Sequence, residues 1–376
     1  MAKILYGVAG EGFGHSSRSH LTAQKLDQAG HEVLFAASNK SYKYLSNYFP
    51  DQVSKIHGLT FHYSNARVSL GKTFLTNLAA LPEMIKINHK AFTKTYPDFA
   101  PDVVITDFEP FTSFWAYMNK VPCLSVDHEH LLCKCDYEKP KTALLARLSS
   151  ESVTKNYLTG VNSHIVLNFF EAKPHNDKVK ITGPVIREKL LDYKPSNDGD
   201  FIIFYATSET CLKKFLELSK LFPRQKFHLY GFTKVDGHKN CVFKEHNAEE
   251  FIYDLSRCRG VIATGGFSLI SECLHFRKKM FIKPIDMQIE QIVNAYHMAK
   301  IGGGMYVNNF NEVSLQSFID WLDEPYYINQ KQVLMPDNER YFSVLSDTLE
   351  QLTNFEVSIK GYDWQKPDFE KELTIA

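Results

Sequence analysis

Short apolar runs alternate with stretches of helical periodicity along the first 180 residues. The run at 3–9 enters a loop rich in Gly and Ser, and the helical pattern of Leu21, Leu26 and Ala29 follows it. Four more runs have the length and β-rich composition of buried strands: 31–36, 102–106, 122–126 and 164–169. This alternation of strands and helices is typical of a doubly wound α/β domain with a parallel sheet.

The alternation breaks near residue 182 and then begins again. Residues 194–200 form a polar stretch with Pro and Gly, which suits a linker or an exposed loop. Beyond it, strand-like runs at 201–206, 227–230, 261–264 and 280–284 are separated by helical patterns at 211–221, 248–256, 268–276 and 289–299. We therefore expect two α/β domains at 1–182 and 183–338, and a C-terminal helix and tail at 339–376 that return to the first domain.

Length and composition agree with this picture. The 376 residues are enough for two domains at about 150 residues each. Hydrophobic residues make up 44% and charged residues 23%, as in ordinary folded proteins. Lys and Arg number 43, and Asp and Glu also number 43, so no excess of positive charge favours nucleic acid as a partner.

The N-terminus and the cysteines bear on the compartment. The first apolar run is interrupted at 10–12 and is too short for a signal peptide or a membrane span. The seven cysteines include no CxxC pair, and their odd number favours reduced thiols. We expect a cytoplasmic protein, with or without a peripheral contact to the inner face of a membrane.

The loop after the first strand, residues 10–18, has the sequence GEGFGHSSR. Its backbone amides and the N-terminus of the following helix can face an anion. A dinucleotide fingerprint is incomplete here, because His15 stands where the third glycine is required and the second strand ends without an acidic residue. We therefore exclude a nicotinamide-dependent dehydrogenase.

His15 lies at the carboxyl end of a strand, the edge at which parallel sheets bind ligands. An imidazole is suited to general-base chemistry at neutral pH. The alternative is that His15 caps the helix or holds an anion. Gly12, Gly14 and Arg18 belong to the same segment, and Arg18 is either a site residue or a solvated helix residue.

Acidic residues follow the strand at 102–106. Asp107 can orient His15 and stabilise its protonated form, as the acid does in nucleophile, base and orienter arrangements. Glu109 is a second polar residue at this edge of the sheet. Capping of the next helix is the alternative for both residues, and for Glu109 it has equal weight.

The next strand is followed by the run DHEH at 127–130. Acidic and His residues that alternate on one loop, without Cys or distant ligands, are a weak indication of a metal site. We interpret His128 and His130 as part of a polar cluster that faces an acceptor, and we expect no metal.

Residues 263–272, ATGGFSLISE, carry the most informative pattern. A strand leads into Gly265 and Gly266 and then into a helix, so free backbone amides and the positive helix end suit a pyrophosphate. Glu272 lies one turn beyond Ser268 on the same helix face and can accept hydrogen bonds from ribose hydroxyls.

A second pair of polar residues begins the helix after the next strand. Glu290 and Gln291 suit the hydroxyl groups of a sugar. Each of these positions alone fits a helix cap or an exposed polar residue. Their occurrence after two strands in succession favours a site for a nucleotide sugar.

At these residues the chain resembles the two-domain GT-B glycosyltransferases, especially the bacterial N-acetylglucosaminyltransferase that makes the second peptidoglycan lipid intermediate, and the UDP-glucuronosyltransferases. The G-G-x-x-S/T-x-x-E pattern of these enzymes is similar to 265–272, with the hydroxyl residue displaced by one position. Their Q-x-x-N-A run is similar to 291–295, their interdomain G-N/P-P-V/I-R segment to 183–187, and their G-x-G-H loop to 12–15.

The resemblance implies two Rossmann-like, doubly wound parallel-sheet domains that face a cleft. It implies that the second domain holds a nucleotide-sugar donor, with UDP as the expected nucleotide, that the first binds an acceptor hydroxyl, and that no cofactor is needed. The expected donor-binding residues are Thr207, Ser208, Glu209, Gly265, Gly266, Phe267, Ser268, Glu272, Glu290 and Gln291. The expected acceptor-binding residues are Gly12, Gly14, Arg18, Glu109, His128 and His130.

The implied activity is inverting transfer of a hexosyl or N-acetylhexosaminyl group, in which His15, oriented by Asp107, deprotonates the acceptor hydroxyl. The expected acceptor is a sugar, a lipid-linked compound or another hydroxyl compound, in cell-envelope glycan or glycolipid synthesis. A nucleotide-sugar epimerase and a non-catalytic nucleotide-sugar-binding protein are the alternatives. Apolar and Lys residues at 72–94 form either a basic surface that meets a lipid-linked acceptor or a core-facing helix.

Overall fold

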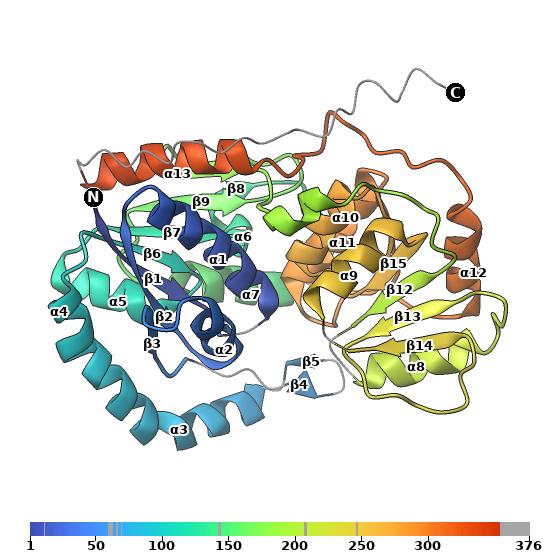
Figure 1. Ribbon diagram of the computed structural model, residues 1–376, viewed down its shortest axis with the longest axis horizontal. Coiled ribbons are helices and arrows are strands. Elements are labelled where there is room, and N and C mark those ends of the chain that lie inside the picture. Colours follow the sequence, from blue (N-terminus) through green and yellow to red (C-terminus); the bar gives the residue numbers. More distant parts are fainter. Residues whose placement is uncertain are drawn as a thin grey trace.

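The computed structural model (Figure 1) describes residues 1–10, 12–58, 63–64, 67–68, 70–141, 144–206, 209–245 and 247–353. Within these, only the backbone is described for 63–64, 67–68, 70–78, 81, 144–146 and 209–210. Figure 1 shows two α/β halves side by side, the N-terminal half on the left and the C-terminal half on the right.

The N-terminal half is built on a seven-stranded sheet in which all neighbouring strands are parallel. In spatial order its strands are β11 (Val179–Thr182), β9 (Ser163–Leu167), β7 (Cys123–Asp127), β6 (Val103–Asp107), β1 (Lys3–Val8), β2 (Glu32–Ala37) and β3 (Val53–Lys55). The central strands are buried on both faces, as a parallel sheet between helical layers requires. The helices are α1 (Phe13–Gln28), α2 (Asn39–Tyr48), α3 (Leu70–Lys90), α4 (Tyr96–Phe99), α5 (Pro110–Asn119), α6 (Leu131–Lys134) and α7 (Leu144–Tyr157).

The C-terminal half repeats this plan with a six-stranded parallel sheet. In spatial order its strands are β14 (Cys241–Lys244), β13 (Phe227–Tyr230), β12 (Ile202–Tyr205), β15 (Gly260–Ala263), β16 (Lys279–Ile282) and β17 (Gly304–Tyr306). Its helices are α8 (Glu209–Ser219), α9 (Ala248–Arg257), α10 (Phe267–His275), α11 (Ile289–Lys300) and α12 (Glu312–Trp321). Two small antiparallel pairs join β4 (Tyr63–Ser64) to β5 (Arg67–Val68) and β8 (Cys135–Asp136) to β10 (Lys173–Pro174).

The last described helix, α13 (Asn338–Thr353), lies along the N-terminal half (Figure 1). The Tyr341 hydroxyl is 2.9 Å from Thr22 Oγ1 in α1. At the start of the helix, Asn338 Oδ1 accepts a hydrogen bond from the Ile186 backbone N at 3.0 Å, and its Nδ2 donates to the Ile186 carbonyl at 2.8 Å. The two segments that cross between the halves are therefore bonded to each other.

The expectation of two α/β units with parallel sheets is confirmed. Each strand expected from an apolar run is present, with ends displaced by up to two residues. The short outer strands β3, β11, β14 and β17 were not predicted, because three or four residues give too little periodicity to separate a strand from a loop.

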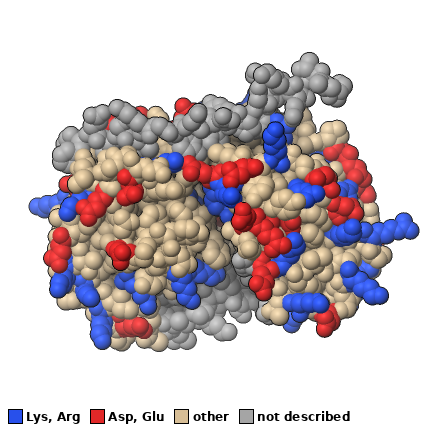
Figure 2. Space-filling model, viewed as in Figure 1, with Lys and Arg blue, Asp and Glu red and all other residues tan. Residues whose placement is uncertain are grey.

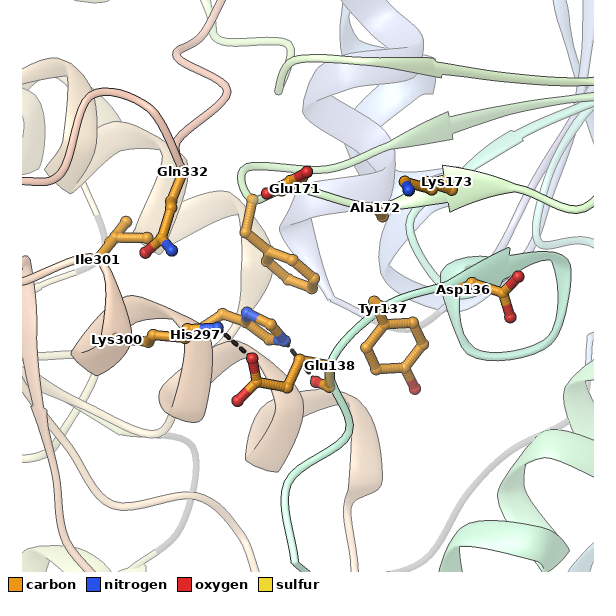
Figure 3. A pocket seen from close by; sticks show the side chains of 11 residues that line it. Asp136, Tyr137, Glu138, Glu171, Ala172, Lys173, His297, Lys300, Ile301 and Gln332 are labelled. Atoms are coloured by element: carbon orange, nitrogen blue, oxygen red, sulfur yellow. Dashed lines mark hydrogen bonds and ion pairs between the residues drawn. The ribbon is translucent and has the colours of Figure 1, made fainter.

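A set of contacts on α11 ties the two halves together at Glu138 (Figure 3). The Glu138 carboxylate pairs with Lys300 and accepts a hydrogen bond from the Tyr296 hydroxyl, and its carbonyl lies 2.9 Å from His297 Nε2. The His297 ring stacks on Phe170 with centroids 3.5 Å apart. The cavity of about 310 Å³ beside this contact is lined by none of the residues predicted to bind a ligand.

The surface in Figure 2 carries basic and acidic side chains scattered over both halves. The chain as a whole contains equal numbers of basic residues (Lys and Arg) and acidic residues (Asp and Glu). Among the described residues, no helix is both long enough and apolar enough to cross a membrane.

Candidate active site between the two halves

The site is built at the carboxyl ends of the neighbouring strands β1, β6 and β7, which meet at one edge of the sheet. The chain leaves β1 and enters α1 after Gly12, whose φ of +79° favours glycine. No described side chain caps α1, and its first turn contains no acidic residue. The N-terminus of a helix carries a partial positive charge, so this end of α1 suits an anion.

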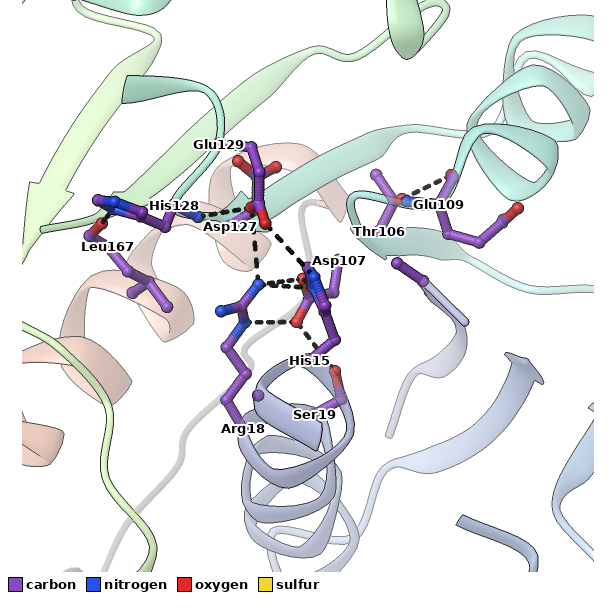
Figure 4. Close-up of polar contacts among 12 residues, drawn as sticks. His15, Arg18, Ser19, Thr106, Asp107, Glu109, Asp127, His128, Glu129 and Leu167 are labelled. Atoms are coloured by element: carbon purple, nitrogen blue, oxygen red, sulfur yellow. Dashed lines mark hydrogen bonds and ion pairs between the residues drawn. The ribbon is translucent and has the colours of Figure 1, made fainter. Parts of the chain in front are cut away.

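His15, Arg18 and Asp107 form a cluster at this edge (Figure 4). His15 Nδ1 lies 2.7 Å from Asp107 Oδ1, and Arg18 Nε donates to Asp107 Oδ2 at 2.6 Å. Ser19 Oγ donates to Asp107 Oδ2 at 3.2 Å. Asp107 is fully buried and Arg18 is 8% exposed. His15 and Asp107, which are 92 residues apart in the chain, are thus in direct contact.

The charges of this cluster change the proton affinity of its members. Burial alone would raise the pKa of Asp107, but Arg18 and His15 hold it below its ordinary value. Burial alone would lower the pKa of His15, but the carboxylates of Asp107 and Glu129 raise it, against the opposing effect of Arg18. The carboxylates of the cluster therefore stabilise the protonated form of His15, and its cations stabilise the ionised form of Asp107.

Glu129 completes the cluster and was not among the residues predicted from the sequence. Its Oε1 lies 3.3 Å from His15 Nε2. Its Oε2 lies 3.7 Å from Arg18 Nη2 and accepts a hydrogen bond from the His128 backbone N at 3.1 Å. The Glu129 carboxylate therefore faces His15 Nε2, the ring nitrogen that Asp107 does not contact. The sequence could not identify Glu129, because the course of the loop decides which residue of the run DHEH turns toward His15.

Glu109 and His130, which were expected to bind the acceptor, make contacts within the local structure. The Glu109 carboxylate is buried and caps α5, accepting from the backbone N of Phe111 at 2.9 Å and of Thr112 at 2.7 Å. The His130 ring is buried, with Nδ1 2.7 Å from Asp127 Oδ2. Helix capping, the alternative given for Glu109, is what the structure shows, and acceptor binding by either residue stays a prediction.

His128 is enclosed between the two halves. Its side chain is 1% exposed and stacks on Phe267 of α10, with ring centroids 4.0 Å apart and planes at 14°. Nδ1 lies 2.7 Å from the Leu167 carbonyl oxygen, and Nε2 lies 2.8 Å from Asn294 Oδ1. Burial lowers the pKa of His128. The contacts of this ring in the structure are therefore all within the protein, and its role in acceptor binding stays a prediction.

The glycine turn, residues 264–268, connects β15 to α10. Gly265 has a φ of +97°, and Gly266 is the N-cap of α10, which has neither a side-chain cap nor an acidic first turn within the described chain. A Cβ atom added at Gly14 would lie 2.3 Å from Ser268 Oγ, so the starts of α1 and α10 are in close contact. Two helix N-termini therefore meet at the boundary between the halves, and helix N-termini suit an anion.

The other polar residues predicted in the C-terminal half have different surroundings. Glu272 is paired with Arg187 of the interdomain segment, whose Nε and Nη2 donate to Glu272 Oε1 at 3.0 and 2.7 Å. Gln291 Oε1 accepts a hydrogen bond at 3.0 Å from a backbone N–H of the preceding loop. Burial, together with the nearby Glu129 carboxylate, raises the pKa of Glu290 to about 8. Glu290 therefore lies close to the charges of the N-terminal half, and burial favours the neutral form of its carboxyl group.

Three predicted residues lie at the start of α8. Thr207 and Ser208 are outside the described residues, and only the backbone of Glu209 is described. Because β12 neighbours β15, the starts of α8 and α10 lie at the same edge of the sheet. Phosphate binding by these three residues stays a prediction.

His15, Asp107 and Glu129 are the described residues whose ligand atoms lie close enough together for a metal ion, within 4.8 Å of one another. Arg18 donates to both oxygens of Asp107. A guanidinium bonded to a carboxylate repels a metal ion at the same carboxylate. His15, Asp107 and Glu129 therefore fit an ion-pair cluster better than a metal centre.

Two Rossmann-like halves with parallel sheets that meet at one boundary form the GT-B architecture (Figure 1). The family model for glycosyl transferase family 1 matches residues 2–323, and the chain belongs to this family. The protein is therefore a glycosyltransferase. It is 24% identical over 363 residues to an uncharacterized glycosyltransferase of Methanosarcina acetivorans, covering 88% of this chain and 93% of the relative. A Methanosarcina mazei relative of the same description is 24% identical over 367 residues, covering 89% and 94%.

Solved glycosyltransferases share the fold. The calicheamicin glycosyltransferase CalG4 has a TM-score of 0.58 at 13% identity, covering 96% of this chain and 95% of its own. Phytolacca americana UGT2, complexed with UDP-2fluoro-glucose and pterostilbene, has a TM-score of 0.58 at 14% identity, covering 95% and 97%. Acinetobacter baumannii MurG has a TM-score of 0.53 at 14% identity, covering 86% and 91%. These matches confirm the GT-B architecture.

Proposed function

We propose that this glycosyltransferase moves a sugar from a nucleoside diphosphate sugar, with UDP as the nucleotide, to an acceptor hydroxyl with inversion at the anomeric carbon. The observation that carries the proposal is the contact of His15 with Asp107 beside the meeting point of α1 and α10. This arrangement places a candidate base, His15 of the N-terminal half, beside a candidate diphosphate site, the glycine turn of the C-terminal half. UDP is further supported by the UDP-sugar in the Phytolacca complex.

In this proposal the diphosphate lies at the glycine turn. The free amides and the positive end of α10 stabilise the negative charge that develops on the departing diphosphate. Glu290 and the neighbouring Gln291 bind hydroxyl groups of the transferred sugar. Glu272 accepts hydrogen bonds from the ribose hydroxyls while it stays paired with Arg187.

His15 acts as the base. The acceptor hydroxyl takes the place of Glu129 at His15 Nε2 and gives its proton to that nitrogen while its oxygen bonds to the anomeric carbon. The bond from the anomeric carbon to the diphosphate oxygen breaks, and its electron pair leaves with the diphosphate. Attack from the face opposite the diphosphate inverts the configuration. Asp107 holds the ring and stabilises the imidazolium.

We further propose that catalysis needs no divalent metal, because the starts of α1 and α10 supply positive potential where the diphosphate lies. The chain contains one D-x-D triplet, at 198–200. It precedes β12 and therefore lies at the end of the sheet opposite the glycine turn. Asp198 pairs with Arg257 at 2.9 Å, and Asp200 pairs with Lys226 at 3.6 Å. Surface ion pairs thus account for both carboxylates.

The acceptor is proposed to be a lipid-linked compound of cell-envelope synthesis, met at a membrane surface. A groove of about 910 Å³ between β3 and α3 supports this assignment, because it combines apolar and basic side chains. Its lining includes Leu34, Val53, Ile87, Lys86 and Lys90. The side chains of Phe74, Leu78 and Leu81, expected at the same surface, lie outside the described ones. Vesicle flotation tests the contact: anionic vesicles should bind the protein, and Lys86→Glu with Lys90→Glu should abolish binding.

A screen of nucleoside diphosphate sugars by thermal shift tests the activity itself. A UDP-sugar should raise the melting temperature, since a ligand that binds the native state stabilises it. His15→Ala should keep this shift and lose transfer of the sugar. Release of an altered nucleotide sugar without an acceptor would identify an epimerase, and binding without any turnover would identify a binding protein. Either result would contradict the proposal.

A further inference from the structure

A histidine of the N-terminal half contacts the glycine turn of the C-terminal half, directly at Phe267 and through Asn294. His128 stacks on Phe267, the first residue of α10, and its Nε2 lies 2.8 Å from Asn294 Oδ1. Asn294 Nδ2 donates in turn to the Gly265 carbonyl oxygen at 3.2 Å. On the other side of the ring, Nδ1 lies 2.7 Å from the carbonyl of Leu167, at the end of β9. Both oxygens only accept hydrogen bonds, so a neutral ring donates to one of them and only a protonated ring donates to both. A chain of contacts therefore runs from the N-terminal sheet to the backbone of the turn.

The orientation of the Asn294 amide follows from its surroundings. A carbonyl oxygen only accepts hydrogen bonds, so the amide nitrogen must face Gly265 and the amide oxygen must face His128. Asn294 is fully buried, and its hydrogen bond to the turn cannot be replaced by water without opening the contact. Loss of the His128 ring would leave the Asn294 oxygen without its partner, which weakens its hold on Gly265.

The glycine turn has one supported face and one open face. A Cβ atom added at Gly265 would lie 3.0 Å from the Gln291 carbonyl oxygen, so this side is packed against α11. A Cβ atom added at Gly266 would meet no described atom within 4 Å. The open side, beside the start of α10, is where a diphosphate has room, while His128 and Asn294 support the opposite side.

We propose that His128 is a positioning residue for the donor diphosphate, which fixes the glycine turn through Asn294 and Phe267. This inference rests on the proposed function, because it takes the turn as the diphosphate site. It makes donor affinity depend on a side chain of the half that binds the acceptor. The two substrates are thereby linked through one buried contact between the halves.

The first test needs no ligand. His128→Phe keeps an aromatic ring on Phe267 but removes both ring nitrogens, and hydrogen exchange of the amides at 264–268 should become faster. His164→Phe is the matched control, since His164 is a buried histidine on β9 whose ring contacts His130 within the N-terminal half. Exchange at 264–268 should stay unchanged in this control. Equal exchange in His128→Phe and the wild type would overturn the proposal.

The second test is calorimetric titration with UDP. His128→Phe should weaken UDP binding about tenfold, the effect of losing a buried hydrogen bond. His128→Gln, whose amide N–H can reach Asn294, should recover part of the affinity. Asn294→Leu should weaken binding to a similar extent, and the double variant with His128→Phe should lose no more than the single ones, because both act through one contact.

Further outcomes separate positioning from a general loosening of the two halves. Glu138→Gln weakens a different contact between the halves, the ion pair of Glu138 with Lys300, and should leave UDP affinity unchanged. Equal losses in Glu138→Gln and His128→Phe, or additive losses in the double variant, would overturn the role of His128. If the wild type binds none of UDP, GDP, ADP, CDP and dTDP, the proposed function fails, and the exchange measurement still decides whether His128 positions the turn.

Discussion

Asp107→Asn tests whether the buried charges of the site balance one another. The substitution keeps the shape of the side chain but removes the charge that faces Arg18 and His15. Arg18 is 8% exposed, with Nε 2.6 Å from Asp107, so its guanidinium would stay buried without this counter-ion. Removing one partner of a buried ion pair costs about 3–5 kcal/mol. The Glu129 carboxylate, 3.7 Å from Arg18, offsets part of this cost. We therefore expect Asp107→Asn to lower the free energy of unfolding by about 3 kcal/mol.

A loss of this size lowers the melting temperature without preventing folding. Domains of 150–250 residues lose about 2–4 °C for each kcal/mol, so Asp107→Asn should melt about 6–12 °C lower than the wild type. Adding Arg18→Met removes the unpaired cation and should recover more than half of the loss, since an apolar replacement of both charges is often neutral. Turnover should stay low in both variants, because neither has a carboxylate to orient His15.

The two measurements are calorimetric melting at pH 7 and steady-state turnover. They are made on the wild type, on Asp107→Asn and on the double variant with Arg18→Met. A double variant that melts no higher than Asp107→Asn would refute the argument from the unpaired charge. Recovered turnover in the double variant would instead refute the orienting role of Asp107.

Four further predictions concern chemistry and binding. His15→Ala should lose turnover by about 10²–10⁴-fold and keep its donor affinity in calorimetry; weakened donor binding with near-normal turnover would make His15 an anion anchor. Glu272→Ala should weaken donor binding by about 1.5–3 kcal/mol, and an unchanged affinity would exclude Glu272 from the ribose site. Because only the neutral ring accepts a proton and nearby carboxylates raise the pKa of His15, kcat/KM should fall as the pH drops through a value above the ordinary one for His. Glu129→Gln should move this fall to lower pH, and an unmoved profile would contradict the contact. EDTA should leave turnover unchanged, whereas a loss that magnesium reverses would show that the diphosphate is held by a metal.

The fold could be predicted because its signal is local. Each central strand is a short apolar run next to a helical pattern, and the alternation of the two specifies parallel sheets. The contact between His15 and Asp107 was predictable for the same reason, since both follow strands whose carboxyl ends share one edge.

The remaining site residues depend on contacts between segments far apart in the chain. Glu129 and His128 are neighbours, yet one faces His15 and the other enters the C-terminal half, which an alternating run does not reveal. Arg187 meets Glu272 only because the interdomain segment passes α10. Glu109 had two interpretations in the sequence, and burial beside Thr112 selects the helix cap.

A crystal structure with the nucleoside diphosphate sugar found in the thermal-shift screen tests the central claim most directly. The account predicts that the diphosphate oxygens accept hydrogen bonds from the amides of 265–268, and that the anomeric carbon faces His15 Nε2 across the boundary of the halves. A diphosphate bound away from the glycine turn, or an anomeric carbon out of reach of an acceptor held at His15, would contradict it.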